Sequence, residues 1–398
     1  MAHQHELFED GIPRDLSNTA RAVWAKSNMQ DPTDRHYLRL WQHLEDTASS
    51  ASLIWEDCVP SDVEGLLAED LGGEDLARQI YLFLASIHDA GKAAPAFQVQ
   101  CSWQADRVRE TGMHIDPVLA ANERRHLYRH ELVGYQTILE WMKRKGFGVG
   151  THSLAYGLAS IVAGHHGSAI DLNKVKSLDQ WDASTFIGGT EWSSIRNELM
   201  DWMARGTGFL DVAHEHERRP IPPRSQILLT ALVIMADWMA SNSYLFPLNE
   251  PLEDNAGGND SWNETHFNST SRAESAWRKI NLPGPWRPAL ETSDPDRLFI
   301  SRFAIPNAKL RPMQRDVVDL AMMMPDPGLI IVEGNMGDGK TEAALLAAEV
   351  LAQRFGCGGV EYALPGQATA NAMFGRVLSW IAHLPTGRPE KFTSLFLA

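Results

Sequence analysis

A glycine-rich loop at residues 334–341 places the strongest constraint on what this chain can fold into. The loop reads Gly-Asn-Met-Gly-Asp-Gly-Lys-Thr and matches the pattern GxxxxGK[ST]. The apolar run 329–332 before it predicts a buried parallel strand, and the Ala/Leu/Glu-rich stretch from Thr341 predicts a helix. A second short strand is predicted at 360–364. Strand, loop, helix and strand in this order are typical of the opening unit of an α/β domain.

Between a strand and a helix, such a loop predicts a binding site for nucleotide phosphates. Its glycines let backbone N–H groups turn inward, Lys340 would reach the β/γ-phosphates, and the Thr341 hydroxyl would ligate magnesium. A ligand-free turn is the alternative, but the predicted strand and helix favour the nucleotide. The loop residues of the predicted ATP–magnesium site are Gly334, Gly337, Gly339, Lys340 and Thr341. No strand ending in an Asp-Glu pair follows Thr341, so we expect the ATPase to be incomplete in this chain.

Residues 1–245 have the hydrophobic periodicity of a helical domain. Apolar residues recur at helical spacing in several segments, with glycine and proline in the gaps. These segments are 38–55, 76–87, 130–141, 153–162, 194–203 and 226–239. Residues 246–300 instead have the acidic, amide, glycine and proline composition of a linker. The sequence thus predicts a helical domain at 1–245, a connecting region at 246–300 and an α/β part at 301–398.

Cysteine usage and charge narrow the class of protein. The three cysteines, Cys58, Cys101 and Cys357, show no CxxC spacing, so disulfides or a thiolate zinc site are not expected. The N-terminus lacks signal-peptide character, and the longest apolar stretch, 227–239, is too short to cross a bilayer. These features predict a cytoplasmic protein without a membrane partner. The net charge of −15 disfavours a broad nucleic-acid-coating surface but permits a local groove with bound metal ions.

Histidine and aspartate residues occur inside or at the ends of apolar segments. His88-Asp89 follows one apolar run, His165-His166 follows another, and Asp237 lies within a third. Each alone is more simply a hydrogen-bonded core histidine or a capping aspartate. Together, imidazoles and carboxylates without thiolates suit iron, manganese, cobalt, nickel or zinc at an open hydrolytic site, with magnesium as a further candidate. Two such metals bridged by a carboxylate could activate water and neutralise a phosphodiester.

In order and residue type, these motifs resemble those of the CRISPR-associated HD-nuclease/helicases of type I systems, especially type I-E. The matching segments are Trp41-Gln-His43-Leu-Glu-Asp46, His88-Asp89-Ala-Gly-Lys92, Arg129-His130-Glu131, His165-His166 and Ala236-Asp237-Trp-Met-Ala-Ser241. Downstream, Leu310-Arg-Pro-Met-Gln314 resembles the helicase element that reads adenine through its glutamine. Residues 364–374 resemble the segment that touches the nucleic-acid strand. The resemblance covers almost the whole chain.

The resemblance implies a two-metal site. The implied ligands of one metal are His43, His88 and Asp237. The implied ligands of the other are His130, His165 and His166. Asp89 would bridge the two metals, and Lys92 and Ser241 would lie beside the substrate phosphate. Asp89, Lys92 and Ser241 are therefore the expected catalytic residues.

The other histidines are expected to be peripheral. His126 lies one helical turn before His130 and is a substitute ligand if the middle histidine is misassigned. His36 and Asp46 are expected to support the site or to lie on the surface. Surface positions are expected for His3, His5, His214, His216, His266 and His383.

By this resemblance, the fold is an all-α HD-superfamily nuclease domain followed by the start of an α/β recombinase-like helicase domain. The implied activity is metal-dependent cleavage of single-stranded DNA, the displaced strand of an R-loop, in antiviral defence with an RNA-guided surveillance complex. The fused ATP-dependent helicase would be incomplete here. Two alternatives are an HD phosphohydrolase that acts on small nucleotides and a nucleotide-binding adaptor with a structural metal. The phosphate loop argues against the first, and retention of every implied ligand argues against the second.

Overall fold

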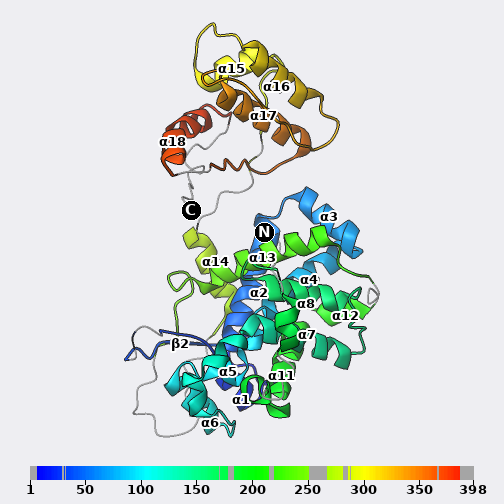
Figure 1. Cartoon of the computed structure of the whole chain (residues 1–398), viewed down its shortest axis with the longest axis vertical. Helices are drawn as coiled ribbons and strands as arrows, with labels where there is room; N and C mark the ends of the chain where they lie inside the picture. Colours follow the sequence, from blue (N-terminus) through cyan, green and yellow to red (C-terminus); the bar gives the residue numbers. More distant parts are fainter. Residues whose placement is uncertain are drawn as a thin grey trace. The chain divides into compact units, whose positions relative to one another are not determined.

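The computed structural model divides the chain into two compact units, Met1–Asn281 and Leu282–Ala398 (Figure 1). The residues that the structure describes are 7–28, 31, 33–169, 171–177, 183–214, 219–250, 267–280, 286, 288–364 and 367–385. The described part of the first unit is helical apart from one antiparallel pair of short strands.

The elements of the first unit run in the following order. They are α1 (Asn18–Ala22), β1 (Trp24–Ser27), β2 (Tyr37–Arg39), α2 (Leu40–Asp57), α3 (Ser61–Leu71), α4 (Glu74–Ile87), the 3₁₀ turn η1 (Ala90–Lys92), α5 (Pro95–Gln98), α6 (Ser102–Glu110), η2 (Pro117–Ala121), η3 (Glu123–Leu127), α7 (His130–Arg144), α8 (Leu154–Gly164), α9 (Leu172–Ser177), α10 (Ala183–Ile187), α11 (Thr190–Gly206), α12 (Phe209–Ala213), α13 (Pro223–Ser241) and α14 (Ser269–Ile280). Each of the six segments predicted from periodicity corresponds to a helix of this unit.

Helix α2 forms the centre of the first unit. Every residue from Leu40 to Trp55 is buried, and α4, α13 and α14 pack against this helix. Its buried residues include polar and charged ones, among them His43, Glu45 and Asp46, so these side chains need partners inside the domain. Helices α7 and α8 pack against each other and extend the same core. The core therefore brings α2, α4, α7, α8 and α13 together, and these helices supply the polar cluster described below.

A short hairpin precedes α2 and was not predicted. Strands β1 and β2 pair antiparallel with Lys26 opposite Leu38. The predicted helical segment 38–55 began too early, because Leu38 and Arg39 belong to β2 and the helix starts at Leu40. Gln98 holds the hairpin from the other side, since its side-chain NH₂ donates to the Trp24 carbonyl at 2.9 Å. The hairpin places the Lys26 side chain beside the end of α13.

The predicted connecting region contains ordered helices. Helix α14 packs against α2, and the Arg272 guanidinium forms an ion pair with the buried Asp46 at 3.0 Å. Ala273 and Ala276 of this helix are also buried in a hydrophobic cluster with Leu53 and Met239, so 269–280 folds with the first unit despite its polar sequence. The second helix of this region is α15 (Pro295–Phe303), in the second unit.

The second unit is also helical in its described part. Its further helices are α16 (Pro312–Met323), α17 (Lys340–Phe355) and α18 (Gln367–Ala382). Leu298, Val318 and Leu346 lie in its core, and Arg302 makes a fully buried ion pair with Glu349 at 2.7 Å. Helix α17 begins one residue before the predicted start, which confirms the loop-to-helix prediction.

The two predicted strands of this unit do not form. Residues 329–332 and 360–364 have no regular structure, and Leu329 and Ile331 are 85% and 76% exposed. A parallel strand needs neighbours to satisfy its backbone N–H and C=O groups. Among the described residues the only sheet is the β1–β2 pair, so neither segment has a strand to join.

The structure bears on the predictions about the cysteines and about membrane-spanning helices. Cys58, Cys101 and Cys357 are all free thiols, as expected from their spacing. Across the described residues, no helix combines the length and apolar character that crossing a bilayer requires.

Candidate metal centre

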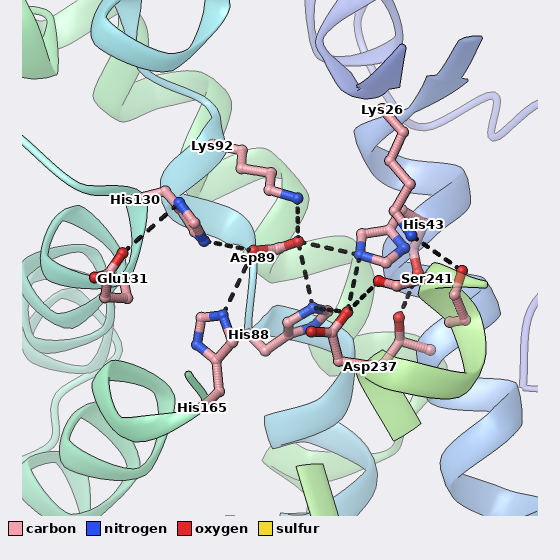
Figure 2. Close-up of polar contacts among 12 residues, drawn as sticks. Lys26, His43, His88, Asp89, Lys92, His130, Glu131, His165, Asp237 and Ser241 are labelled. Carbon is pink, nitrogen blue, oxygen red and sulfur yellow. Dashed lines mark hydrogen bonds and ion pairs between the residues drawn. The ribbon is translucent and has the colours of Figure 1, made fainter. Parts of the chain in front are cut away.

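The polar cluster is assembled at the junction of helix ends in the first unit (Figure 2). His43 lies within α2, His88 ends α4, and Asp89 precedes η1. His130 is the first residue of α7, His165 and His166 follow α8, and Asp237 lies in the last turns of α13. The structure thus brings together all the residues that the resemblance implied as metal ligands.

A close backbone approach at Gly91 sets the position of Asp89. A Cβ atom added at Gly91 would lie 2.0 Å from the His130 carbonyl oxygen and 2.5 Å from the Gly134 nitrogen. Both neighbours are backbone atoms that cannot move without shifting α7. Glycine is therefore required for η1 to lie against the start of α7, which is what brings Asp89 next to His130.

The first group of donors surrounds one oxygen of Asp89. The Asp89 Oδ2 atom lies 3.0 Å from His43 Nε2 and 3.3 Å from His88 Nε2. Asp237 Oδ1 lies 3.3 Å from His88 Nε2 and 3.6 Å from His43 Nε2. One ligand atom from each of these four residues lies within 4.8 Å of the others.

The second group of donors surrounds the other oxygen of Asp89. Its Oδ1 atom lies 3.2 Å from His130 Nε2 and 3.8 Å from His165 Nε2. His166 Nε2 lies 2.9 Å from His130 Nε2, so two ring nitrogens face each other. Asp89 is the residue that both groups share, which is the geometry expected of a bridging carboxylate.

Unsatisfied buried atoms show that this donor set fits metal ions. His88 Nε2, His165 Nε2 and Asp89 Oδ1 are buried and have no hydrogen-bond partner, although their neighbours lie within ion-pair distance. The other ring nitrogens are occupied, because His88 Nδ1–H donates to the Ala85 carbonyl at 2.8 Å and His165 Nδ1–H to the Val162 carbonyl at 2.5 Å. These bonds turn the Nε2 atoms of both rings toward the cluster, as in metal-binding histidines. Imidazole and carboxylate donors suit divalent transition metals.

The pKa values of the buried histidines are shifted in opposite directions by burial and by the two carboxylates. Burial lowers the pKa of His43 and of His165 to about 3, so both rings stay neutral and able to ligate. Burial also acts to lower the pKa of His88, but Asp89 and Asp237 outweigh it and raise that pKa to about 10. The pKa values of both carboxyls are lowered despite burial, Asp89 chiefly by Lys92 and Asp237 chiefly by His88. Both carboxylates therefore remain ionised.

The implied catalytic residues contact the two carboxylates. Lys92 Nζ lies 2.5 Å from Asp89 Oδ2, and the Ser241 hydroxyl donates to Asp237 Oδ1 at 2.6 Å. Two further residues at the cluster were not predicted. Glu131 Oε2 lies 3.7 Å from His130 Nδ1, and its place directly after His130 in the quoted motif was the available signal. Lys26 reaches the cluster from β1, which no sequence pattern placed near it.

The other histidines lie away from the cluster. His126 is exposed in η3 and joins neither group of donors, so it does not replace His130. His36 is exposed and contacts Asp34 at 2.7 Å, whereas Asp46 is buried against Arg272. His214 and His383 are exposed, as expected. Those outside the described residues are His3, His5, His216 and His266.

In the second unit, the phosphate loop lines a cavity of about 780 Å³. Gly337 and Gly339 adopt left-handed backbone angles, with φ of 90° and 83°. Lys340 Nζ donates to the carbonyls of Gly334 at 2.6 Å and Asn335 at 2.8 Å. A carbonyl-bound lysine at a helix N-terminus can exchange these partners for phosphate oxygens.

Gln314 lies against this loop. Its side-chain NH₂ donates to the Gly339 carbonyl at 3.1 Å, and its oxygen accepts from Arg311 N–H at 3.0 Å. Gln314, Lys340 and Thr341 all line the cavity. The structure thus gathers the residues that the sequence predicted for adenine and phosphate recognition.

Helical packing around a His-Asp pair, with further histidines and an aspartate converging on it, defines an HD-type metal-binding domain. Residues 24–246 match the family model described as "Cas3, HD domain", and the chain belongs to this family. The match ends just past α13, so it contains every residue of the polar cluster.

Several curated relatives are similar over nearly the whole chain. The "CRISPR-associated nuclease/helicase Cas3" of Streptococcus thermophilus is 29% identical over 393 residues, covering 93% of this chain and 39% of that protein. The "CRISPR-associated endonuclease/helicase Cas3" of Thermus thermophilus is 28% identical, covering 94% and 37%. The chain therefore spans about two fifths of the length of these relatives.

Solved structures show the same fold. One described as "Crystal structure of CRISPR-associated protein" has a TM-score of 0.67 and 25% identity, and the match covers 94% of this chain and 39% of that one. T. fusca Cas3 bound to AMPPNP has a TM-score of 0.62 at 22% identity, covering 93% and 38%. These matches confirm the HD-type helical fold.

Proposed function

We propose that this chain is the metal-dependent DNA nuclease part of a CRISPR-associated nuclease/helicase. The observation that carries the proposal is the Asp89 carboxylate, whose two oxygens face two separate groups of histidine donors. This arrangement supports a two-metal hydrolase. The relatives from Streptococcus thermophilus and Thermus thermophilus are described as nuclease/helicases, which supports nucleic acid as its substrate.

The proposed ligands follow the two groups of donors. His43, His88 and Asp237 would hold one divalent metal. His130, His165 and His166 would hold the other, with Asp89 shared. Iron, manganese, cobalt or nickel would supply the positive charge and water activation that phosphodiester hydrolysis requires.

The residues around the ligands orient the site. The Ser241 hydroxyl fixes the Asp237 carboxylate, and the Lys92 ammonium lies against Asp89. Lys92 would offset the charge of a substrate phosphate that approaches Asp89. Both side chains would therefore bind or position the phosphate rather than hold a metal.

Single-stranded DNA is the proposed substrate. His43 and Asp89 are buried, so a scissile phosphate must enter a recess to reach them. A stiff duplex resists such bending, whereas a single strand can follow a recessed path. The displaced strand of an R-loop in antiviral defence, in the cytoplasm, would supply this substrate. A structural neighbour described as "CRISPR RNA-guided surveillance complex, pre-nicking" supports such a complex as the partner.

The phosphate loop is proposed to bind ATP with magnesium. Lys340 would contact the β/γ-phosphates, Thr341 would ligate magnesium, and Gln314 would contact adenine. The cavity that these three residues line supports the proposal. Nucleotide binding here belongs to the helicase part and is not needed for cleavage at the metal centre.

The test is cleavage of matched substrates by protein loaded with manganese, cobalt or nickel, without ATP. We expect circular single-stranded DNA to be cut and supercoiled duplex to be left almost intact, with Asp89→Asn as the inactive control. Equal cutting of duplex, or a strict ATP requirement, would contradict the proposal. Hydrolysis of mononucleotides alone would favour a small-nucleotide phosphohydrolase. Bound metal without any cleavage would favour an adaptor.

A further inference from the structure

Lys26 is a cation at the metal centre that the proposed mechanism does not use. It projects from β1, and its ammonium donates to the Ala240 carbonyl at 3.1 Å. Ala240 lies near the end of α13, between Asp237 and Ser241 in the sequence. Figure 2 shows the Lys26 side chain reaching toward His43 and Ser241, on the other side of the cluster from His130.

The Lys26 ammonium has unused hydrogen-bonding capacity. An ammonium carries three N–H donors, and the described residues give it one acceptor, a neutral carbonyl. No carboxylate in the described part of the chain lies within 4.0 Å of it, whereas Lys92 is paired with Asp89 at 2.5 Å. Burial, followed by the nearby Lys92, lowers the pKa of Lys26 to about 8. A largely buried cation without an ionic partner is costly, so its surroundings favour an anion.

We propose that Lys26 forms a phosphate subsite beside the metal centre, holding a backbone phosphate of the DNA strand next to the scissile one. The proposal rests on the nuclease function proposed above. In Figure 2, Lys26 and Lys92 enter the cluster from the same side, Lys92 toward Asp89 and Lys26 toward His43, so a strand that follows this side would meet two cations in succession. The net charge of −15 offers no general attraction for DNA, so binding of a phosphate at this position depends on a local cation.

A purely structural role makes different predictions. The Lys26 ammonium also interacts favourably with the C-terminal end of α13, which carries Asp237 and Ser241. If that were its whole contribution, removing it would disturb a metal ligand and lower kcat or metal content. A phosphate subsite instead contributes binding that is equal in ground and transition states, so its loss raises KM.

The experiment compares Lys26→Met with Lys26→Arg in the full chain loaded with manganese. Methionine keeps the length of the side chain and removes its charge, while arginine keeps the charge. Lys143→Met is the matched control, because Lys143 is exposed on α7 about 20 Å along the helix from His130. Steady-state cleavage of a single-stranded oligonucleotide is measured over a range of salt concentrations, together with bound metal and the melting temperature.

For Lys26→Met we expect KM to rise about tenfold, with kcat changed less than about twofold and metal content unchanged. The slope of log(kcat/KM) against log(salt) should become shallower by about 0.7, the value for one phosphate contact on a single strand. Lys26→Arg should retain the slope, and Lys143→Met should match the parent protein.

Three results would overturn the subsite. They are an unchanged KM and salt slope in Lys26→Met, loss of bound metal in that variant, and loss of the slope in Lys26→Arg. If Lys26→Met does not fold, the salt slope of Lys26→Arg and of Lys26→Gln decides. Failure of the parent protein itself to cut single-stranded DNA would instead refute the nuclease function, which distinguishes the two proposals.

Discussion

The metal centre and the phosphate loop are built in opposite ways. The candidate ligands of the metal centre come from several helices, from His43 in α2 to Asp237 in α13, and most are buried. The phosphate loop is a single stretch, 334–341, in which Met336 is fully exposed. The first site depends on how the domain packs, whereas the second depends on local backbone angles at its glycines.

The charged side chains of the two sites also have different partners. In the metal centre, carboxylates, imidazoles and Lys92 already contact one another within the core. In the phosphate loop, Lys340 donates only to carbonyls of its own loop. Substitutions in the first site should therefore affect activity, metal binding and stability together. Substitutions in the second should affect ligand binding alone.

The largest effect is expected for Asp89. Asp89→Asn removes the charge that both groups of donors share, and we expect cleavage of single-stranded DNA to fall by roughly a thousandfold or more. His43→Ala and His166→Ala should each lose one metal, since each touches one group. Metal stoichiometry and cleavage rates measure both effects. An Asp89→Asn protein that binds two metals and cuts at the parental rate would show that the bridging assignment is wrong.

Gly91→Ala should combine loss of stability with loss of activity. The added methyl group would meet backbone atoms of His130 and Gly134, so α7 must shift, at a cost of about 2–4 kcal/mol. Denaturant unfolding and cleavage assays check this expectation. Gly65→Ala is the matched control, because Gly65 lies in α3 with open space around it. That variant should be neutral or slightly more stable, and equal behaviour of the two would contradict the close-approach argument.

Acid should weaken the first unit before its carboxylates titrate. His43 and His165 have folded pKa values of about 3, whereas an unfolded histidine titrates near its model value of 6.5. The unfolded state therefore binds more protons below pH 6.5, and each histidine lowers the free energy of unfolding by up to about 1.4 kcal/mol per pH unit. His88, with its raised pKa, contributes stability that is present below pH 6.5 and is lost as pH rises toward 10.

Urea unfolding of the metal-free protein is monitored by tryptophan fluorescence at several pH values between 6.5 and 5. It measures the slope of the free energy of unfolding against pH. His165→Asn should make the slope shallower, because one of the two neutral histidines is removed. A stability that stays constant over this range would be inconsistent with neutral buried histidines.

The smallest effect on cleavage is expected for Lys340→Ala. The proposed metal ligands all precede residue 245, so the rate of single-strand cutting without ATP should remain within about twofold of the parent. Binding of an ATP analogue, measured by calorimetry, should fall at least about tenfold, since Lys340 supplies a charged contact to phosphate. A cleavage defect in Lys340→Ala would show that the two sites do not act independently.

The sequence predicted helices α2, α4, α7, α8, α11, α13 and α17, because apolar spacing survives in any amphipathic or buried helix. Helices with a weaker apolar pattern, such as α5 and α14, were not predicted. It also predicted every candidate metal ligand of the polar cluster, through short motifs that the family resemblance ordered. The hairpin at 24–39 was missed because its strands are too short for alternation to be recognised. Lys26 was missed with it, since nothing in the sequence places residue 26 beside residue 240. The predictions of strands at 329–332 and 360–364 were wrong, because an apolar run does not specify its pairing partners.

Sharing Asp89 makes the two halves of the metal centre one thermodynamic system. Its Oδ2 faces His43 and His88, while its Oδ1 faces His130 and His165. A cation that neutralises one oxygen weakens the negative charge felt at the other, so occupancy of one half changes affinity at the second. By reciprocity the free-energy change is the same in either order of loading. The two metals should thus bind with unequal, interdependent affinities, and a chelator should remove the second more slowly than the first.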